Sequence, residues 1–253
     1  ERNYPARDFR GQEPCDELRT SGGIWLFDAM GADQVFSESS RFATGLRHTV
    51  AMATHSGGAL YGAPHGIDHL DRWWPQAGYS REQAASIPSE TLFKIDSAQD
   101  YGFPYCMHDP RSSRMILTPA YREAVSFGER CAGVPKPIAT FPAHSAPLAM
   151  VFYEGKQFPQ RYRDGAFVAL HGSLFHAPLD PAGYSVAFVP SSTLKAGGSI
   201  ETFAKGAGRS ISNPMSQTMR PSGLAVDSTG ALYISDDNSG RIWRIRWIGQ
   251  TGQ

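Results

Sequence analysis

The sequence predicts an all-β fold, a β-propeller that is only partly contained in these 253 residues. Three observations support this prediction. Short apolar runs follow one another without long amphipathic helices between them. A strand–turn–strand pattern recurs along the chain, which is the signature of a repeat architecture. The 26 glycines and 18 prolines provide the turns that many short strands require.

The repeat is clearest in Arg47–Gly66, Phe141–Phe175 and Arg220–Gly240. Each stretch contains an apolar strand, a turn of small or polar residues, and a second strand of the form Gly-Ala-Leu-Tyr or Gly-Ala-Phe-Val. At about 40–50 residues per blade, and with two large insertions, residues 1–253 would form a single domain of about four blades. A six-bladed ring would need N-terminal blades before residue 1.

The remaining elements are expected around these repeats. Residues 1–21 are polar and predict a loop, and Gly23–Asp28 resembles Arg241–Ile245, the closing strand of a repeat. Ser80 followed by Gln83 matches a capping box and predicts a short helix at 81–86. Residues 106–140 show no strand alternation and predict a long loop with a binding or lid role. Further strands are expected at 46–54, 59–63, 91–95, 148–153, 166–170, 186–189, 200–203, 224–226, 232–235 and 241–247.

The charge balance excludes several classes of partner. Twenty-four basic and 24 acidic side chains offset each other, and no basic run interleaves with aromatic residues, so a nucleic-acid partner is not expected. No apolar run approaches the roughly 20 residues that span a bilayer, so no transmembrane segment is expected.

The chain has three cysteines, enough for one disulfide. A bridge between Cys106 and Cys131 would restrict the intervening segment in the unfolded state, and it would indicate an exported protein. Two separate buried thiols are the alternative. Cys15 is left without an evident partner.

Candidate site residues occupy equivalent positions in the repeats. Arg47 and Arg220 each precede a first strand, whereas His65-Gly66, His171-Gly172 and Asp236-Asp237 follow second strands. Equivalent positions of propeller blades lie on one ring around the channel mouth. Two guanidinium groups there would suit a ligand with carboxylate or quinone oxygens, because their forks bind such groups bidentately.

Each candidate also has a structural interpretation. A single arginine at the start of a strand is most often a surface charge or an ion-pair partner. His65 and His69 have the i, i+4 spacing of a helical zinc pair, but Pro64 and Gly66 disfavour a helix there. Asp236–Asn238 could bind calcium, although Asp and Asn more commonly build turns. For His55, His144, Trp73 and Trp74, a structural role and a functional role are both open.

Five stretches in order resemble one known family. They are FATGLRHTVAMA, GALYGAPHGIDHL, YGFPYC, FPAHSAPLAMVFYEGKQFPQRYRDGAFVALHGS and RPSGLAVDSTGALYISDDNSGRIWRI. They resemble the C-terminal part of the L-sorbosone dehydrogenase-like sugar dehydrogenases, which depend on pyrroloquinoline quinone (PQQ) and are related to soluble glucose dehydrogenase. The resemblance implies a six-bladed propeller, a calcium ion under the quinone, a periplasmic or secreted location, and oxidation of a sugar or aldehyde.

The resemblance also implies roles for individual residues. Arg47 matches the arginine that contacts the quinone oxygens, and His48 stands where a related enzyme has asparagine, so both are implied in catalysis. Arg220 matches an arginine that binds a cofactor carboxylate. Gly66 and Ile67 match the residues whose backbone carbonyls hold calcium.

The resemblance places His65 beside the calcium ligands, and His171, Gly172 and Ser173 in the turn that faces the cofactor. The family turn continues Trp-Asn-Arg, whereas here Leu174–His176 replace those residues. The family's catalytic base is a histidine from blades that would precede residue 1. Implied partners are a sugar or aldehyde substrate, a cytochrome or quinone electron acceptor, and a larger protein assembly.

Two alternatives from other classes remain open. The first is a non-catalytic propeller that serves as an accessory or scaffold subunit of an exported assembly. The altered turn at Leu174–His176 favours it. The second is a calcium-dependent lactonase-like hydrolase, but the sequence shows no ring of Asn, Asp and Glu ligands for it.

Overall fold

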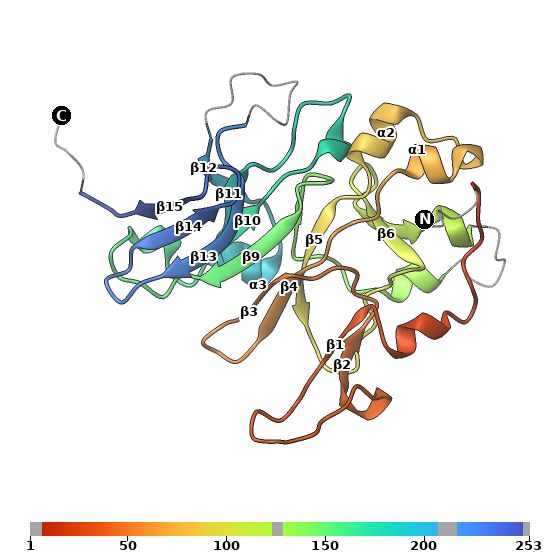
Figure 1. Ribbon diagram of the computed structural model, residues 1–253, viewed down its shortest axis with the longest axis horizontal. Helices are drawn as coiled ribbons and strands as arrows, with labels where there is room; N and C mark the ends of the chain where they lie inside the picture. Colours follow the sequence, from red (N-terminus) through yellow and green to blue (C-terminus); the bar gives the residue numbers. More distant parts are fainter. Residues whose placement is uncertain (1–6, 123–128, 207–216, 250–253) are drawn as a thin grey trace.

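A computed structural model describes residues 7–122, 129–206 and 217–249, in which the named strands pair antiparallel (Figure 1). The strands are β1 (Gly23–Trp25), β2 (Arg41–Thr44), β3 (Ala51–Thr54), β4 (Leu60–Ala63), β5 (Glu90–Ile95), β6 (Cys106–Asp109), β7 (Arg114–Leu117), β8 (Ala139–Phe141), β9 (Pro147–Phe152), β10 (Ala166–Leu170), β11 (Ser185–Val189), β12 (Glu201–Lys205), β13 (Pro221–Val226), β14 (Leu232–Asp236) and β15 (Arg241–Ile245). The helices are α1 (Leu70–Trp73), α2 (Arg81–Ser86) and α3 (Ser191–Ala196). The all-β prediction is confirmed.

Three sheets with up-and-down strand order form the body of the described chain. Their orders are β3-β4-β5-β8, β9-β10-β11-β12 and β13-β14-β15, and the pairs β1–β2 and β6–β7 flank them. In Figure 1 the three sheets lie side by side, with β13–β15 at the left and β3–β5 near the centre. Up-and-down order is that of a propeller blade, whereas ring closure and the number of blades stay predictions.

The middle sheet is buried on both faces. Along β10, Val168 belongs to an apolar cluster with Phe141 and Phe152, whereas Phe167 belongs to a second cluster with Leu232 of the next sheet. Successive side chains of a strand point to opposite faces, so β10 contributes to both clusters. This explains why Ala166–Leu170 is continuously apolar rather than alternating.

The expectation of a loop throughout residues 106–140 is wrong for most of the described part. β6 and β7 form a hairpin there, and β8 pairs with β5. All four residues of β6 are buried, so this strand carries no alternation that the sequence could reveal. The polar residues between β6 and β7 form the hairpin turn. Residues 123–128 lie outside the described residues.

The expected strand at 46–54 is shorter in the structure, where β3 begins only at Ala51. Gly45 has a φ of 73°, a left-handed conformation that ends β2. The N-terminal segment was expected to be a loop. Its described part, residues 7–21, contains one short 3₁₀ turn, Asp16–Arg19. Residues 1–6 lie outside the described residues.

The insertion between β4 and β5 contains the predicted helix. The Ser80 hydroxyl accepts a hydrogen bond from the Gln83 N–H at 3.2 Å, and the Gln83 side chain accepts one from the Ser80 N–H at 2.8 Å. This capping box is confirmed, with α2 beginning at the next residue. The unpredicted helix α1 starts after His69, which has a φ of 59°. His65 therefore shares no helix with His69, and no cluster of three or more metal-ligating side chains occurs among the described residues.

The disulfide between Cys106 and Cys131 is confirmed. Both cysteines are buried in a cluster with Tyr105 and Tyr121. Cys15 carries a free thiol, and its backbone N–H donates a hydrogen bond to the Tyr105 hydroxyl at 2.9 Å. The bridge therefore ties the β6–β7 hairpin to the segment that leads into β8.

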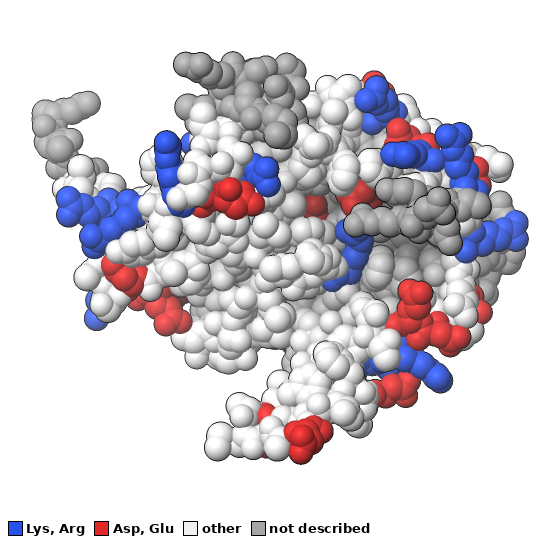
Figure 2. All heavy atoms as spheres, viewed as in Figure 1, with Lys and Arg blue, Asp and Glu red and all other residues white. Residues whose placement is uncertain are grey.

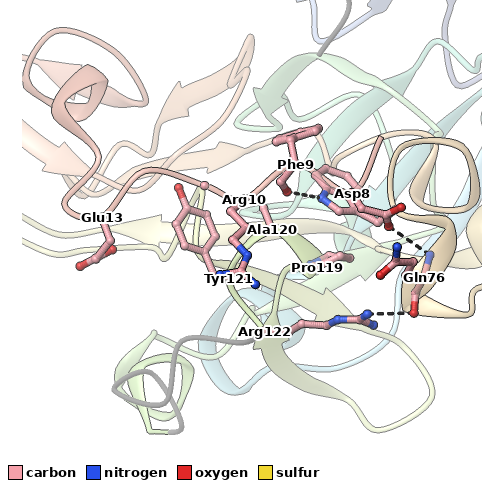
Figure 3. Close-up of a pocket in the computed structure, with 11 residues that line it drawn as sticks. Asp8, Phe9, Arg10, Glu13, Gln76, Pro119, Ala120, Tyr121 and Arg122 are labelled. Carbon is pink, nitrogen blue, oxygen red and sulfur yellow. Dashed lines mark hydrogen bonds between the residues drawn. The ribbon is translucent and has the colours of Figure 1, made fainter. Parts of the chain in front are cut away.

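The N-terminal segment packs against the insertion between β4 and β5 and against residues 119–122, which follow β7, and forms a cavity of about 300 Å³ with them (Figure 3). The Trp74 indole donates to the Phe9 carbonyl, so the packing interpretation of this tryptophan is confirmed. Gln76 bridges the walls, because its N–H donates to Asp8 and its carbonyl accepts from Arg122. This cavity shares no lining residue with the candidate site described below.

The surface carries mixed charges. On the face shown in Figure 2, most lysine and arginine side chains lie near acidic ones, and a small basic group lies at the left, near β15. In the same residues, no helix has the length and apolar character needed to cross a membrane.

Candidate cofactor site

A cavity of about 470 Å³ lies where the segments after β4 and β10 meet the segments before β9 and β13. Six of the residues singled out in the sequence line it: His65, Gly66, His171, Gly172, Ser173 and Arg220. They come from three different sheets, so equivalent ends of successive strand pairs converge on one opening. The volume lies within the range of roughly 300–1,000 Å³ typical of small-molecule sites.

Arg220 and His171 form a polar corner of the cavity with Asp237. The His171 Nδ1 lies 3.0 Å from the Gly172 carbonyl, and its Nε2 lies 3.0 Å from the Arg220 guanidinium and 3.1 Å from an Asp237 carboxylate oxygen. Arg220 Nε also lies 3.3 Å from the Asp237 carboxylate. The neighbouring Asp236 accepts from the Arg220 and Asn238 N–H groups. Asp236 therefore builds the turn, as the structural interpretation proposed.

Arg47 lies behind the cavity wall rather than on it. Its Nη1 donates to the Gly66 carbonyl at 2.5 Å, and its Nη2 lies 3.3 Å from an Asp68 carboxylate oxygen. Arg47 and Ile67 instead line another, smaller cavity of about 40 Å³. His48 is exposed, and its ring centroid lies 4.9 Å from that of His65. Arg47 thus fixes the segment after β4, while Arg220 faces the main cavity.

The cavity also contains a pair that was not predicted from the sequence, formed by the buried His144 and the partly exposed Asp68. The His144 Nδ1 lies 3.0 Å from Asp68 Oδ1, and Nε2 lies 2.9 Å from the Ala84 carbonyl of α2. Both partners accept hydrogen bonds, so both are satisfied only when His144 carries a proton on each ring nitrogen.

The pKa directions of the pair agree with this geometry. Burial lowers the pKa of His144, but Asp68 and the Ala84 carbonyl raise it by more, so the pKa lies above its ordinary value. Burial raises the pKa of Asp68, but His144 and Arg47 lower it by more. At His65, burial lowers the pKa and outweighs the hydrogen bond to the Pro147 carbonyl. One cavity wall therefore carries two histidines of opposite tendency: His65 binds a proton less readily than a free imidazole, and His144 binds one more readily.

Glu90, the first residue of β5, joins two walls of the cavity. Its side chain accepts hydrogen bonds from the Gly66 N–H at 2.6 Å and from the Ala146 N–H at 3.4 Å. Only 2% of the residue is exposed. Burial raises the pKa of this carboxyl to about 7, against the opposing effect of the Gly66 N–H and of His144. Glu90 therefore connects the segment after β4 to the segment before β9.

The raised pKa predicts a pH dependence of stability. Between pH 4.5, the ordinary pKa, and about 7, the folded protein retains a proton at Glu90 that the unfolded chain has lost. The free energy of unfolding therefore falls as pH rises through this window, by at most about 3 kcal/mol. Glu90→Gln should remove this part of the fall, as measured by urea unfolding at several pH values. Glu154→Gln, at an exposed position, should keep it, and an unchanged profile in Glu90→Gln would contradict the prediction.

The turn after His171 forms the mouth of the cavity. Gly172 has a φ of 81°, and a side chain there would collide with the Tyr184 ring, so glycine is required. The Ser173 hydroxyl then accepts from the Phe175 N–H at 3.2 Å. Leu174 and Phe175 are 57% and 44% exposed at the mouth. The departure from the family turn thus places an apolar wall at the entrance.

Comparisons with known proteins agree with this architecture. Residues 23–247 match the family described as TrAA12-like. A Trichoderma reesei protein described as Carbohydrate-Active Enzymes Family AA12, in a structure titled an iodide structure, superposes with a TM-score of 0.70 at 19% identity, over 92% of this chain and 63% of that one. The PQQ domain of pyranose dehydrogenase from Coprinopsis cinerea, in its holo form, gives 0.55 at 21%, over 83% of this chain and 56% of that one.

A curated protein from Borreliella burgdorferi, described as uncharacterized, is 26% identical over 159 residues, which are 62% of this chain and 38% of that protein. The chain thus spans less than two thirds of the length of each of these relatives. At these sequence identities, the structural similarity shows a shared fold and nothing more. Because the family match extends over residues 23–247, the chain belongs to the TrAA12-like family.

Proposed function

We propose that the protein is a PQQ- and calcium-dependent dehydrogenase that oxidises a sugar or an aldehyde, of the aldose or sorbosone type. One observation carries the proposal. His65, Gly66, His171, Gly172 and Arg220, chosen from the sequence because of their repeat positions, line the same cavity, together with Ser173, which the family resemblance indicated. The similarity to a protein described as a pyranose dehydrogenase PQQ domain supports it further.

The cavity residues fit an anionic, planar cofactor. Arg220 lines the wall with a guanidinium whose Nε and Nη2 contact His171 and Asp237, so Nη1 is the nitrogen that can donate to a carboxylate or quinone oxygen. His171 and Asp237 contact this guanidinium and fix its direction. The largest part of the cavity surface is apolar, as expected for a site that holds an aromatic ring system.

The cavity residues offer fewer contacts to calcium than to the quinone. The proposed ligands are the backbone carbonyls of Gly66 and Ile67. Gly66 lines the cofactor cavity, whereas Ile67 lines only the smaller cavity beside Arg47, and the Gly66 carbonyl already accepts a hydrogen bond from Arg47. A carbonyl oxygen has two lone pairs, so one of them stays available to a cation. Calcium takes about six to eight oxygen ligands, so the cofactor and water would have to supply the others. We propose that Arg47 and Glu90 orient this segment, since they hold its carbonyl and its N–H respectively.

When bound, PQQ accepts a hydride from the substrate carbon. In this proposal Arg220 stabilises negative charge at the cofactor, and the apolar turn at Leu174–Phe175 limits access of water. In this proposal a histidine accepts the proton of the substrate hydroxyl. His144 is not suited to this role, because Asp68 and the Ala84 carbonyl engage both of its ring nitrogens.

We further propose that the protein works in the periplasm or is secreted. The disulfide between Cys106 and Cys131 supports this location, since such bridges persist in oxidising compartments. A cytochrome or a quinone would then take up the electrons, and the protein could belong to a larger assembly.

Reconstitution tests the proposed function. Full-length protein is incubated with calcium and PQQ, and reduction of an electron-accepting dye is followed with a panel of aldoses and aldehydes. We expect sugar-dependent reduction that requires PQQ and is lost on chelation of calcium. Tight binding of PQQ without any turnover would favour the accessory-subunit alternative. The altered turn at Leu174–His176 also favours that alternative. Absence of PQQ binding would contradict the proposal.

A further inference from the structure

A second cavity, of about 140 Å³, adjoins the candidate cofactor cavity. Leu174 and Phe175 line both, so the two spaces meet at the turn that contains these residues. The far side of the smaller cavity is lined by His69, Asp71 and Arg81, which belong to the insertion between β4 and β5. The two cavities together therefore extend from the strand ends to helices α1 and α2.

Phe175 provides an aromatic surface between the two spaces. Its ring centroid lies 6.4 Å from that of His144 in the larger cavity and 4.4 Å from that of His69 in the smaller one. With 44% of the residue exposed, part of the ring stays open to a ligand. An aromatic face of this kind contacts the C–H groups of a sugar ring, whose hydroxyl groups then point sideways to polar partners.

The smaller cavity is lined by both a hydrogen-bond acceptor and a hydrogen-bond donor. The Asp71 carboxylate accepts hydrogen bonds, and the Arg81 guanidinium donates them. Neither side chain has a hydrogen-bond or ion-pair partner within residues 7–122, 129–206 and 217–249. Hydroxyl groups both donate and accept, so a neutral sugar ring matches this pair, whereas a purely anionic or purely cationic group would meet one like charge.

We propose that the smaller cavity is a second sugar subsite and that the preferred substrate is a neutral oligosaccharide of at least two rings. The inference rests on the proposed function. The reducing-end ring lies in the larger cavity, where its C1 hemiacetal is oxidised to a lactone: C1 loses a hydride to the quinone and its hydroxyl proton to a base. The adjoining ring lies against Phe175 and bonds to Asp71 and Arg81.

Steady-state kinetics test the subsite in full-length protein loaded with calcium and PQQ. We expect kcat/KM for cellobiose or maltose to exceed that for glucose by about 10-fold, since one hydrogen bond to a charged group contributes about this factor. Arg81→Gln should lower the disaccharide value by about 10-fold and the ratio of disaccharide to glucose toward one. The surface control Arg161→Gln, at an exposed residue that pairs with Glu201 of β12 and lines neither cavity, should preserve the ratio.

Calorimetric titration of the protein with cellobiose and maltose, without added PQQ, separates this inference from the proposed function. Binding that Arg81→Gln weakens supports the subsite even if PQQ fails to bind. PQQ-dependent oxidation of glucose with no preference for either disaccharide, or an equal loss for glucose and disaccharide in Arg81→Gln, overturns the subsite and leaves the proposed function intact. Absence of calorimetric binding together with absence of a kinetic preference overturns it as well.

Discussion

Arg220→Glu is expected to weaken PQQ binding by about 1,000-fold or more. The guanidinium makes charge-assisted hydrogen bonds to cofactor carboxylates in the proposed complex, and each contributes about 1.5–3 kcal/mol. The glutamate adds repulsion between like charges, so the total loss reaches about 4 kcal/mol, which corresponds to a factor of about 1,000. Equilibrium titration of the calcium-loaded protein with PQQ measures the change.

Two further variants distinguish loss of a ligand contact from local unfolding. Arg220→Ala removes the contact without new repulsion and should cost about 10- to 100-fold. Arg161→Glu makes the same charge reversal at an exposed residue that does not line the cavity, and it should bind PQQ like the natural protein. Equal affinities for all of these proteins would show that the cofactor, if bound, does not contact Arg220.

Removing the disulfide should give the largest loss of stability. Cys106 and Cys131 are 25 residues apart in sequence. A closed loop of this size lowers the entropy of the unfolded chain enough to stabilise the fold by about 3.5 kcal/mol. The double variant Cys106→Ser/Cys131→Ser should lose about this much, as measured by denaturant unfolding with an unchanged slope. Cys15→Ser, at the free thiol, serves as the control. A double variant within about 1 kcal/mol of the natural protein would contradict the prediction.

The sequence predicted those parts of the fold that repeat. Strands β4, β10 and β14 each precede a polar segment, and local pattern alone located all three. The helix at α2 was predictable because a capping box is a contact between residues three apart. The β6–β7 hairpin was not, since Cys106–Asp109 is buried throughout and so has no period-two pattern.

The candidate site was predictable where it depends on repeat position and not where it depends on contacts between distant segments. Arg220 and His171 were chosen for their repeat positions, whereas Glu90 and Asp68 were not singled out and the role of His144 was left open between structure and catalysis. A signal existed for Glu90, because an acidic residue opens the apolar run of β5, and a carboxylate at such a position needs buried partners. Its partners, the N–H groups of Gly66 and Ala146, could be identified only from the folded chain.

A structure of the full-length protein crystallised with calcium and PQQ tests the central claim most directly. The claim predicts the ring system of PQQ in the cavity of about 470 Å³, with a carboxylate or quinone oxygen within hydrogen-bond distance of the Arg220 guanidinium and an ion at the Gly66 carbonyl. PQQ bound elsewhere on the protein, or held in this cavity without contact to Arg220, would contradict it.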